Sequence, residues 1–426
     1  LAPTVLPADS GEFQFVSYVL GIAHPPGYPL YTMLAKLFTF LPVGDIAYRV
    51  NLFSAVTSAL TLVVLSRAVR RVTGSALSGW IAAAVLAVAP TFWAQGTTAN
   101  IRSLTALFTA LQVGSLIHYA QSKNGRCLII FAAALGLGIT HHTSLVPLAA
   151  AYLLFLWVSD PGMLDRPHAW FRPALAFLLS LVVYLYLPLR SLTGAPFDPQ
   201  PIRSVSGFLE HVLALGFRGD MFYFVQPAVL LSRLRVFMNI VVLQFGWLWL
   251  LLALVGTVSL LLRRQRLLLL LGGSLAINAL LAITYRAPQT VEYLMPTYVV
   301  LAFLGALGVW SVSRSLRPPA AWGRAAAAVL LAATLCIPIS TLVANYSSFS
   351  QLSQDRSARE YAEGILAKTP QGARILSNWH FATEFWYLQY VEAMRPDVEV
   401  VYVYPQGAEP IAQTWLRRVG ESSEMR

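Results

Sequence analysis

The sequence predicts a mainly α-helical protein that crosses a membrane about ten times and ends in the start of a smaller α/β segment. Apolar residues make up 57% of the 426 residues, and only 12% are charged. The mean hydropathy of +0.62 excludes a soluble globular enzyme. The net charge of +11 comes mainly from short arginine clusters between long apolar runs, which is typical of cytoplasmic loops and not of a nucleic-acid-binding surface. We therefore expect a lipid bilayer around the protein and no nucleic acid among its partners.

Residues 1–45 are expected to form an extracytoplasmic first loop with interfacial helices. The first residues resemble the outer end of a helix, so we expect one more span before Leu1. The segment 28–41 predicts a helix that is too short to span a bilayer.

Ten apolar segments within residues 46–343 predict a transmembrane bundle whose spans alternate in direction. Arg67, Arg70 and Arg71 end the first span, and the positive-inside rule places them in the cytoplasm. The later arginine clusters then also fall on the inner side. The spans are predicted at about 46–66, 76–93, 103–120, 127–141, 144–158, 173–189, 236–262, 267–284, 294–312 and 325–343. With the expected N-terminal helix there would be about eleven.

Two parts of the chain lie outside these spans. A long extracytoplasmic loop is expected at about 191–234, with a surface helix near 208–215. Residues 344–426 change in character and predict a truncated soluble segment on the same side as Asp9. Within it, a strand at 373–377, a helix at 381–393 and a strand at 397–404 predict a parallel βα unit.

Two carboxylates, Asp9 and Glu12, stand three residues apart in the first loop of a chain with only 19 acidic residues. On a helix this spacing places both on one face, where they would repel each other or share a cation, and either could act as a base. The alternative is that Asp9 and Ser10 cap a short helix, with Glu12 in its first turn. The segment HPPGYP at residues 24–29 follows, and its prolines and glycine fix an irregular backbone. An ordinary connection does not need such a corner, so the catalytic interpretation is favoured.

These motifs carry a family resemblance. DSGEF, GIAHPPGYPLY and YRVNLFSA resemble the opening of a family long described only as multi-spanning proteins of unknown function. Its eukaryotic member is similar to an endoplasmic-reticulum protein O-mannosyltransferase acting on plexin-type receptors. Further similar segments are GLGITHHTSLVPLAA at 136–150, YLYLPLRS at 184–191, EHVLALGFRGDMF at 210–222 and YLQYVEAMRPDVEVV at 387–401.

The resemblance implies a GT-C type membrane glycosyltransferase. Such proteins have about eleven helices, a catalytic aspartate in the first extracytoplasmic loop, a Pro-Pro corner after it and an outer soluble domain. The lipid A aminoarabinose transferases, more distant members of this type, carry Lys-Pro-Pro where this chain has His24-Pro25-Pro26. The implied donor is a polyprenyl-phosphate-linked sugar, with mannose suggested by the eukaryotic relative. The acceptor would be a hydroxyl of an exported protein's Ser or Thr, a lipid or a glycan. With Asp9 as the base, one displacement would invert the anomeric carbon.

The chain departs from the family pattern at two places. An acidic residue expected after the third helix is replaced by Asn100, in the segment ANIRSL. An aspartate expected before the tenth helix is replaced by Gln289 or Thr290, with Glu292 nearby. Either change could alter the choice of acceptor or the use of a metal.

A departing phosphate needs cations. We predict that His24, Arg102, Arg190 and Arg286 bind it, because each lies near an extracytoplasmic helix end. Arginine donates two hydrogen bonds to a phosphate in a fixed geometry. The alternative for each arginine is an extended side chain that reaches lipid headgroups.

Five further residues could support the site or belong to it. Arg49 and Asn51 could anchor the first loop instead. His141 and His142 point about 100° apart on a helix, so at most one faces the site. Glu292 is the fifth candidate. Glu12 could orient the acceptor or help to hold a divalent metal, so a metal stays open.

Two other classes of function compete with an enzyme. A transporter or lipid-linked-substrate flippase would place charged residues near the bilayer midplane, often in repeated halves, and neither feature is evident. A non-catalytic membrane subunit with an outer binding domain is the third class. The lack of a disulfide pattern favours a bacterial inner membrane over the endoplasmic reticulum.

Overall fold

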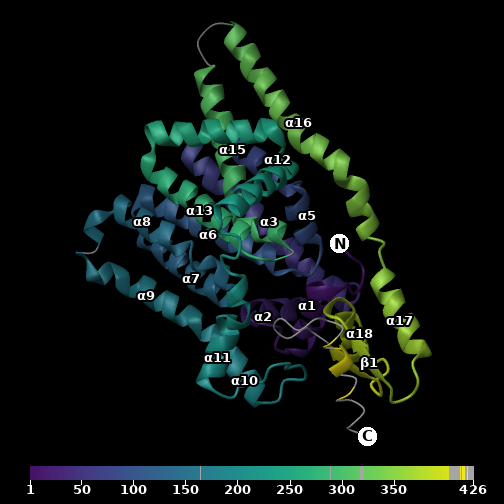
Figure 1. The fold of residues 1–426 in the computed structure, drawn as a ribbon. Helices are drawn as coiled ribbons and strands as arrows, with labels where there is room; N and C mark the ends of the chain where they lie inside the picture. The colour runs from purple at the N-terminus through teal and green to yellow at the C-terminus, as the bar shows by residue number, and fades with distance from the viewer. Residues whose placement is uncertain are drawn as a thin grey trace.

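The computed structural model describes residues 1–163, 165–287, 289–316 and 321–402, and beyond them residues 413, 415–417 and 420. Each of the ten predicted spans is helical (Figure 1). The corresponding elements are α3 (Ile46–Thr73), α4 (Ala76–Ala87) with α5 (Pro90–Thr97), α6 (Ile101–Ser122), α7 (Gly125–His141), η1 (Thr143–Leu145) with α8 (Ala149–Ser159), α9 (Pro167–Leu181) with η3 (Val182–Leu185) and α10 (Tyr186–Leu192), α12 (Pro227–Arg263), α13 (Gln265–Thr284), α15 (Met295–Ser315) and α16 (Ala321–Leu352).

Six helices of the described chain are long and apolar enough to cross a membrane, and the bent pair α4–α5 would make a seventh. The bend between α4 and α5 is 71°. Helices α7 and α8, with 17 and 11 residues, are shorter than the roughly 20 residues that a bilayer core requires. The predicted membrane bundle is therefore confirmed as a fold, and seven of the ten predicted spans could cross a membrane by length and composition. Helices α7 and α8 are shorter, and the 22-residue α6 is not among the helices that are apolar enough.

Helix α15 is the centre of the bundle. Of its most apolar window, 83% is buried, and α12, α13, α4 and α6 pack around it. Glycines let α12 and α15 approach closely. A Cβ at Gly308 would lie 1.8 Å from the Leu252 carbonyl oxygen, and one at Gly256 would lie 2.1 Å from that of Leu304. Small residues at helix crossings serve the same purpose in membrane bundles generally.

The first loop and the C-terminal segment meet at one end of this bundle (Figure 1). Helix α1 (Ala8–Val19) packs on α18 (Trp379–Glu392), and α2 (Pro29–Phe38) lies beside α1 and α3. A Cβ at Gly11 would lie 2.8 Å from Thr383 Oγ1, so glycine at this position allows α18 to contact α1 directly.

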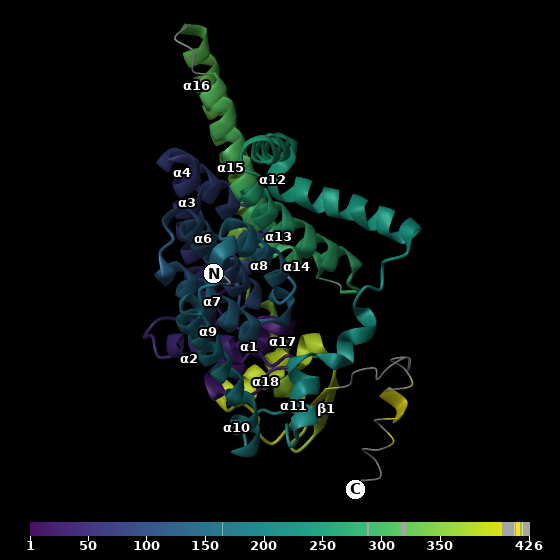
Figure 2. The same ribbon diagram turned by 90° about the vertical axis from the view of Figure 1, so that its left-hand side faces the viewer.

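The predicted βα unit is confirmed. Strand β1 (Arg374–Ser377) pairs in parallel with β2 (Glu399–Tyr402), and α18 connects them. Positions 403 and 404 of the predicted second strand lie outside the described residues. Helix α17 (Ser357–Lys368) precedes this unit, and α16 runs along the outside of the bundle and projects beyond it (Figure 2).

The long loop is shorter than expected at its C-terminal end. It contains α11 (Val205–Val212) and η4 (Leu215–Asp220), which confirms a helix near 208–215. Helix α12 already begins at Pro227, because proline at the first helical position favours a helix start. Gly246, with φ 71°, then kinks α12. The remaining short elements are η2 (Pro161–Met163) and α14 (Thr290–Tyr293).

Candidate active site

Asp9 lies in the first turn of α1 without capping it. The N-cap position is Pro7, and no side chain caps the helix. The Asp9 carboxylate instead accepts a hydrogen bond from Trp379 Nε1 on α18, at 2.8 Å. Ser10 donates its hydroxyl to the Ala99 carbonyl oxygen at 2.9 Å and so ties α1 to the start of α6. Asp9 and Ser10 therefore do not cap the helix, and the capping alternative is wrong for both.

Glu12 and the partly exposed His24 form an ion pair next to Asp9. Glu12 is fully buried, and its two carboxylate oxygens receive the backbone N–H of His24, at 2.8 Å, and its ring Nδ1–H. Burial acts to lower the pKa of His24, but the charge and hydrogen bond of Glu12 outweigh it and raise this pKa to about 9. Burial raises the pKa of Glu12, against the charge of His24. The pair therefore holds a proton at neutral pH.

This ion pair predicts a pH-dependent stability. Both pKa values are raised above their ordinary values, so the folded protein binds more protons than the unfolded chain. The contribution of His24 is present below its unfolded pKa of 6.5 and is lost as the pH rises to about 9. We expect the free energy of unfolding to fall over this range by on the order of 3 kcal/mol.

Thermal unfolding in detergent between pH 6 and 9.5 measures this effect. Glu384, whose pKa burial raises to about 8, also destabilises the fold as the pH rises, so the informative quantity is the difference between wild type and Glu12→Gln. The decline between about pH 6.5 and 9 should be smaller in Glu12→Gln. Equal declines in the two proteins would contradict the assignment.

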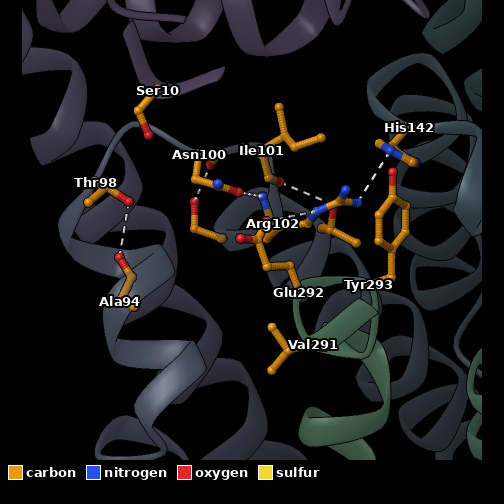
Figure 3. Close-up of polar contacts among 12 residues, drawn as sticks. Ser10, Ala94, Thr98, Asn100, Ile101, Arg102, His142, Val291, Glu292 and Tyr293 are labelled. Carbon is orange, nitrogen blue, oxygen red and sulfur yellow. Dashed lines mark hydrogen bonds and ion pairs between the residues drawn. The ribbon is translucent and has the colours of Figure 1, made fainter. Parts of the chain in front are cut away.

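Arg102 lies at the start of α6, beside His142 and the α14 residues Glu292 and Tyr293 (Figure 3). Its side chain is buried between aromatic and acidic groups of α14: the guanidinium lies 3.7 Å from the centre of the Tyr293 ring, and Nε lies 4.0 Å from Glu292 Oε2. Nε has no hydrogen-bond partner in the described chain. A buried guanidinium with an unused N–H is suited to binding an anion.

His142 completes a set of donors beside Arg102. Its Nδ1 accepts the backbone N–H of Ser144 at 3.0 Å, which assigns the proton of the neutral ring to Nε2. That Nε2 lies 3.3 Å from Arg102 Nη1, so two N–H donors face one another. An oxygen of a phosphate placed between them would accept from both.

The acidic and basic groups act on one another across the site. The negative charge of Asp9 contributes to the raised pKa of Glu12, His24 and Glu292, after burial as the largest cause for Glu12 and Glu292. Ring contacts show that these groups lie together. The His24 ring lies 5.5 Å from the ring of Trp379, which bonds to Asp9. The Tyr28 ring lies 5.3 Å from that of His24 and 5.8 Å from that of His142. The residues come from α1, the α1–α2 loop, the start of α6, the segment after α7, and α14.

Three of the weaker candidates have anchoring contacts. Arg49 donates to the carbonyl oxygens of residues 39, 43 and 44. Asn51 accepts from Gln14 at 3.0 Å and donates to the Ala2 carbonyl oxygen at 2.9 Å. His141 Nε2 donates to the Ile101 carbonyl oxygen at 2.9 Å, so His142 is the histidine that faces the site.

Two of the predicted phosphate-binding arginines have partners elsewhere. Arg190 Nε donates to the Leu20 carbonyl oxygen at 2.8 Å. Arg286 pairs with Asp220 at 2.6 Å and lies over the Tyr223 ring, with its side chain half exposed. Their role at a donor phosphate stays a prediction.

Sequence reasoning missed Trp379 and Tyr293. Trp379 is 370 positions from Asp9, and no pattern in the sequence connects the two. A tyrosine at the end of a predicted span usually belongs to an interfacial aromatic belt, so the sequence gives no sign that Tyr293 lies in the site. Its ring packs on Arg102 because the short helix α14 turns it inward.

No group of three or more His, Cys, Asp or Glu side chains in the described ranges is arranged to hold a metal ion.

Residues 9–162 match the model of the family described as "Protein O-mannosyl-transferase TMEM260 N-terminal domain". The mouse protein O-mannosyl-transferase TMEM260 is 33% identical over 49% of this chain and 31% of its own length. The protein O-mannosyl-transferase tmem260 of Dictyostelium discoideum is 22% identical over 94% of this chain and 54% of its own. The chain thus spans about one third and about half of the length of these two curated relatives. The resemblance to this family of GT-C type proteins is confirmed.

Solved structures confirm the fold class. The chain is similar to ArnT from Cupriavidus metallidurans bound to undecaprenyl phosphate, with a TM-score of 0.61 and 13% identity over 94% of this chain and 86% of that one. It is also similar to an oligosaccharyltransferase from Archaeoglobus fulgidus in complex with zinc and sulfate, with a TM-score of 0.58 and 14% identity over 93% and 58% of the two chains. The fold is that of the GT-C membrane glycosyltransferases.

Proposed function

From the family resemblance over residues 9–162, we propose that the chain is an inverting membrane glycosyltransferase that moves a sugar from a polyprenyl-phosphate donor to a hydroxyl group. The observation that carries the proposal is the juxtaposition of the Asp9 carboxylate with the donors of His24, Arg102 and His142. A hydroxyl nucleophile needs a base, and a phosphate leaving group needs cations or hydrogen-bond donors. This site supplies a carboxylate for the first need and the three donor side chains for the second.

Asp9 acts as the base in a single displacement. Its carboxylate takes the proton of the acceptor hydroxyl while the oxygen forms a bond to the anomeric carbon of the sugar. The bond between that carbon and the phosphate oxygen breaks at the same time, and its electron pair leaves with the polyprenyl phosphate. The configuration at the anomeric carbon is inverted, so a β-linked donor gives an α-linked product.

Arg102, His142 and His24 bind the departing phosphate. Arg102 offers its unpartnered Nε–H, and His142 offers Nε2–H beside Arg102 Nη1. Glu12 keeps His24 protonated, so a positive charge remains near the phosphate. These fixed donors would stabilise the negative charge that develops as the bond to the sugar breaks.

The acceptor is proposed to be a Ser or Thr hydroxyl of an exported protein, and the sugar mannose, because the curated relatives are named protein O-mannosyl-transferases. The site is proposed to face the extracytoplasmic side, since the arginine clusters Arg67–Arg71 and Arg263–Arg266 lie at the opposite ends of α3 and α12 from it. A bacterial inner membrane is the proposed location.

An assay in proteoliposomes separates this proposal from the transporter alternative. The purified protein would be reconstituted with labelled polyprenyl-phosphate mannose and a Ser/Thr-rich acceptor peptide. We expect covalent label on the peptide and one free polyprenyl phosphate for each sugar transferred. Movement of the intact lipid across the bilayer without labelled peptide would favour a flippase and contradict the proposal.

Trp379 positions Asp9 in this reaction. Trp379→Phe removes the indole N–H that bonds to the carboxylate and keeps most of the aromatic packing. Because hydrogen bonds to charged groups contribute about 1.5–3 kcal/mol, we expect kcat to fall about 10- to 150-fold with little change in the KM for the donor. Steady-state kinetics in detergent measure both.

Trp386→Phe is the matched control. Trp386 lies on the same helix, and its indole N–H points to the Val400 carbonyl oxygen, outside the site. This substitution should lower the melting temperature and leave kcat unchanged. Equal losses of kcat in the two variants would assign Trp379 a purely structural role.

A further inference from the structure

A pocket lies at the opposite end of the bundle from Asp9. It has a volume of about 490 Å³ and is lined by the ends of α3, α6 and α8 and by residues 262–267, where α12 turns into α13. Helix α6 begins at the active site with Arg102 and reaches this pocket at Ala120. At 1.5 Å per residue the two sites are about 27 Å apart along α6.

Three arginines at the pocket have no acidic partner. Arg263, Arg264 and Arg266 line it, and none of them forms an ion pair within the part of the chain that the structure describes. Arg264 donates to the Val72 carbonyl oxygen at 2.8 Å, which fixes its side chain at the pocket. All three are exposed to solvent, and the repulsion among three cations within four residues is offset when an anion binds between them.

The acid nearest in sequence to the pocket wall does not neutralise these arginines. Asp160 accepts the hydroxyl of Tyr119 at 2.6 Å and pairs with Lys123 and Arg166. Its negative charge is therefore already matched by two cations of the α6–α9 region.

A buried hydroxyl also faces this pocket without a partner. Ser159 lines the pocket, is only 8% exposed, and its Oγ has no hydrogen bond in the described chain. Unpaired buried hydroxyls are rare because they lose hydration without compensation. The first turn of α13 begins at Gln265 beside it, and free backbone N–H groups at a helix N-terminus favour an anion.

Apart from Gln121, the rest of the lining is apolar. Ile117, Phe155 and Leu267 are buried at the pocket, and Leu262 at its edge is 75% exposed on the surface expected to face lipid. The volume lies within the range of about 300–1,000 Å³ typical of small-molecule sites. The pocket therefore combines a cationic rim with an apolar wall that opens toward the bilayer.

We propose that this pocket binds the phosphate of an anionic phospholipid headgroup. The three guanidinium groups and the Ser159 hydroxyl donate hydrogen bonds to the phosphate oxygens, and the apolar wall contacts the glycerol and the first methylene groups. A water-soluble phosphate would use the cationic rim and gain nothing from the apolar wall, so a lipid is the better fit. The proposal does not depend on the function assigned to the Asp9 site.

Lipid retention in nanodiscs tests the proposal. The purified protein would be placed in nanodiscs of mixed phosphatidylglycerol and phosphatidylcholine, and the lipids that stay bound would be counted by native mass spectrometry. An arginine near an anionic surface contributes about fivefold to binding, so Arg263→Gln/Arg266→Gln should weaken phosphatidylglycerol retention about twentyfold. Ala120→Phe, which fills the pocket without changing charge, should also reduce retention.

The control is Arg67→Gln/Arg70→Gln, which removes two exposed charges at the same end of the bundle but outside the pocket. This variant should retain phosphatidylglycerol as the wild type does. An equal loss of phosphatidylglycerol retention in both double variants, or no loss in either, would contradict the assignment of the lipid to this pocket. Displacement of the lipid by millimolar glycerol phosphate in solution would overturn the lipid as ligand and assign the pocket to a soluble phosphate compound.

Discussion

Asp9→Asn is expected to reduce sugar transfer about a thousandfold while leaving the fold intact. A positioned general base contributes about 10²- to 10⁴-fold, and an amide cannot accept the proton of the acceptor hydroxyl. The amide oxygen of Asn can still accept the hydrogen bond from Trp379 Nε1, so the contact between α1 and α18 should remain. The loss should appear in kcat, with binding of the donor unchanged.

The measurement is the rate of label transfer from polyprenyl-phosphate mannose, with the melting temperature recorded for each protein. Asp165→Asn, which removes an exposed aspartate in the α8–α9 connection, is the matched control and should keep full activity. If Asp9→Asn retained more than a tenth of wild-type activity, Asp9 would not be the base.

Arg102→Lys is expected to lower kcat about a hundredfold. The substitution keeps a positive charge but removes the planar fork that aligns Nε and Nη1 with a phosphate, and it weakens stacking on the Tyr293 ring. Removing one preorganised donor from a transition state commonly costs about 10²- to 10³-fold in rate. Single-turnover rates at saturating donor measure this loss separately from binding.

Arg67→Lys is the control for membrane insertion and expression. Arg67 is exposed and lies near the end of α3 that is remote from the active site. This variant should behave as the wild type does. The substitutions Arg190→Lys and Arg286→Lys test whether these arginines also contact the donor, by the same single-turnover rates. Full activity of Arg102→Lys would contradict its assignment to the phosphate.

The membrane bundle could be predicted from the sequence because hydropathy and arginine position follow directly from the bilayer. The pairing of Asp9 and Glu12 on one helical face was predictable for a similar reason, since the three-residue spacing is local. The sequence could not predict that the two carboxylates have different partners. Glu12 is fully buried against His24, whereas Asp9 accepts a hydrogen bond from Trp379.

Contacts between segments far apart in the chain could not be predicted from the sequence. Arg286 was assigned to the site from its position at a span end, yet Asp220, 66 residues earlier, pairs with it. The family pattern places an acid where this chain has Asn100, and its side chain accepts the Arg102 backbone N–H at 2.8 Å. The carboxylate beside the Arg102 guanidinium comes instead from Glu292, on α14. Only the fold brings these residues together.

The most direct test of the proposed reaction is the choice of donor by the purified wild-type protein. Labelled mannose and glucose would each be supplied as the polyprenyl phosphate and as the nucleotide sugar, with the same acceptor peptide. We expect transfer from a lipid-linked donor only, mannose being preferred, with inversion at the anomeric carbon seen by NMR of the product. Transfer from the nucleotide sugar alone, or a product with retained configuration, would contradict the account.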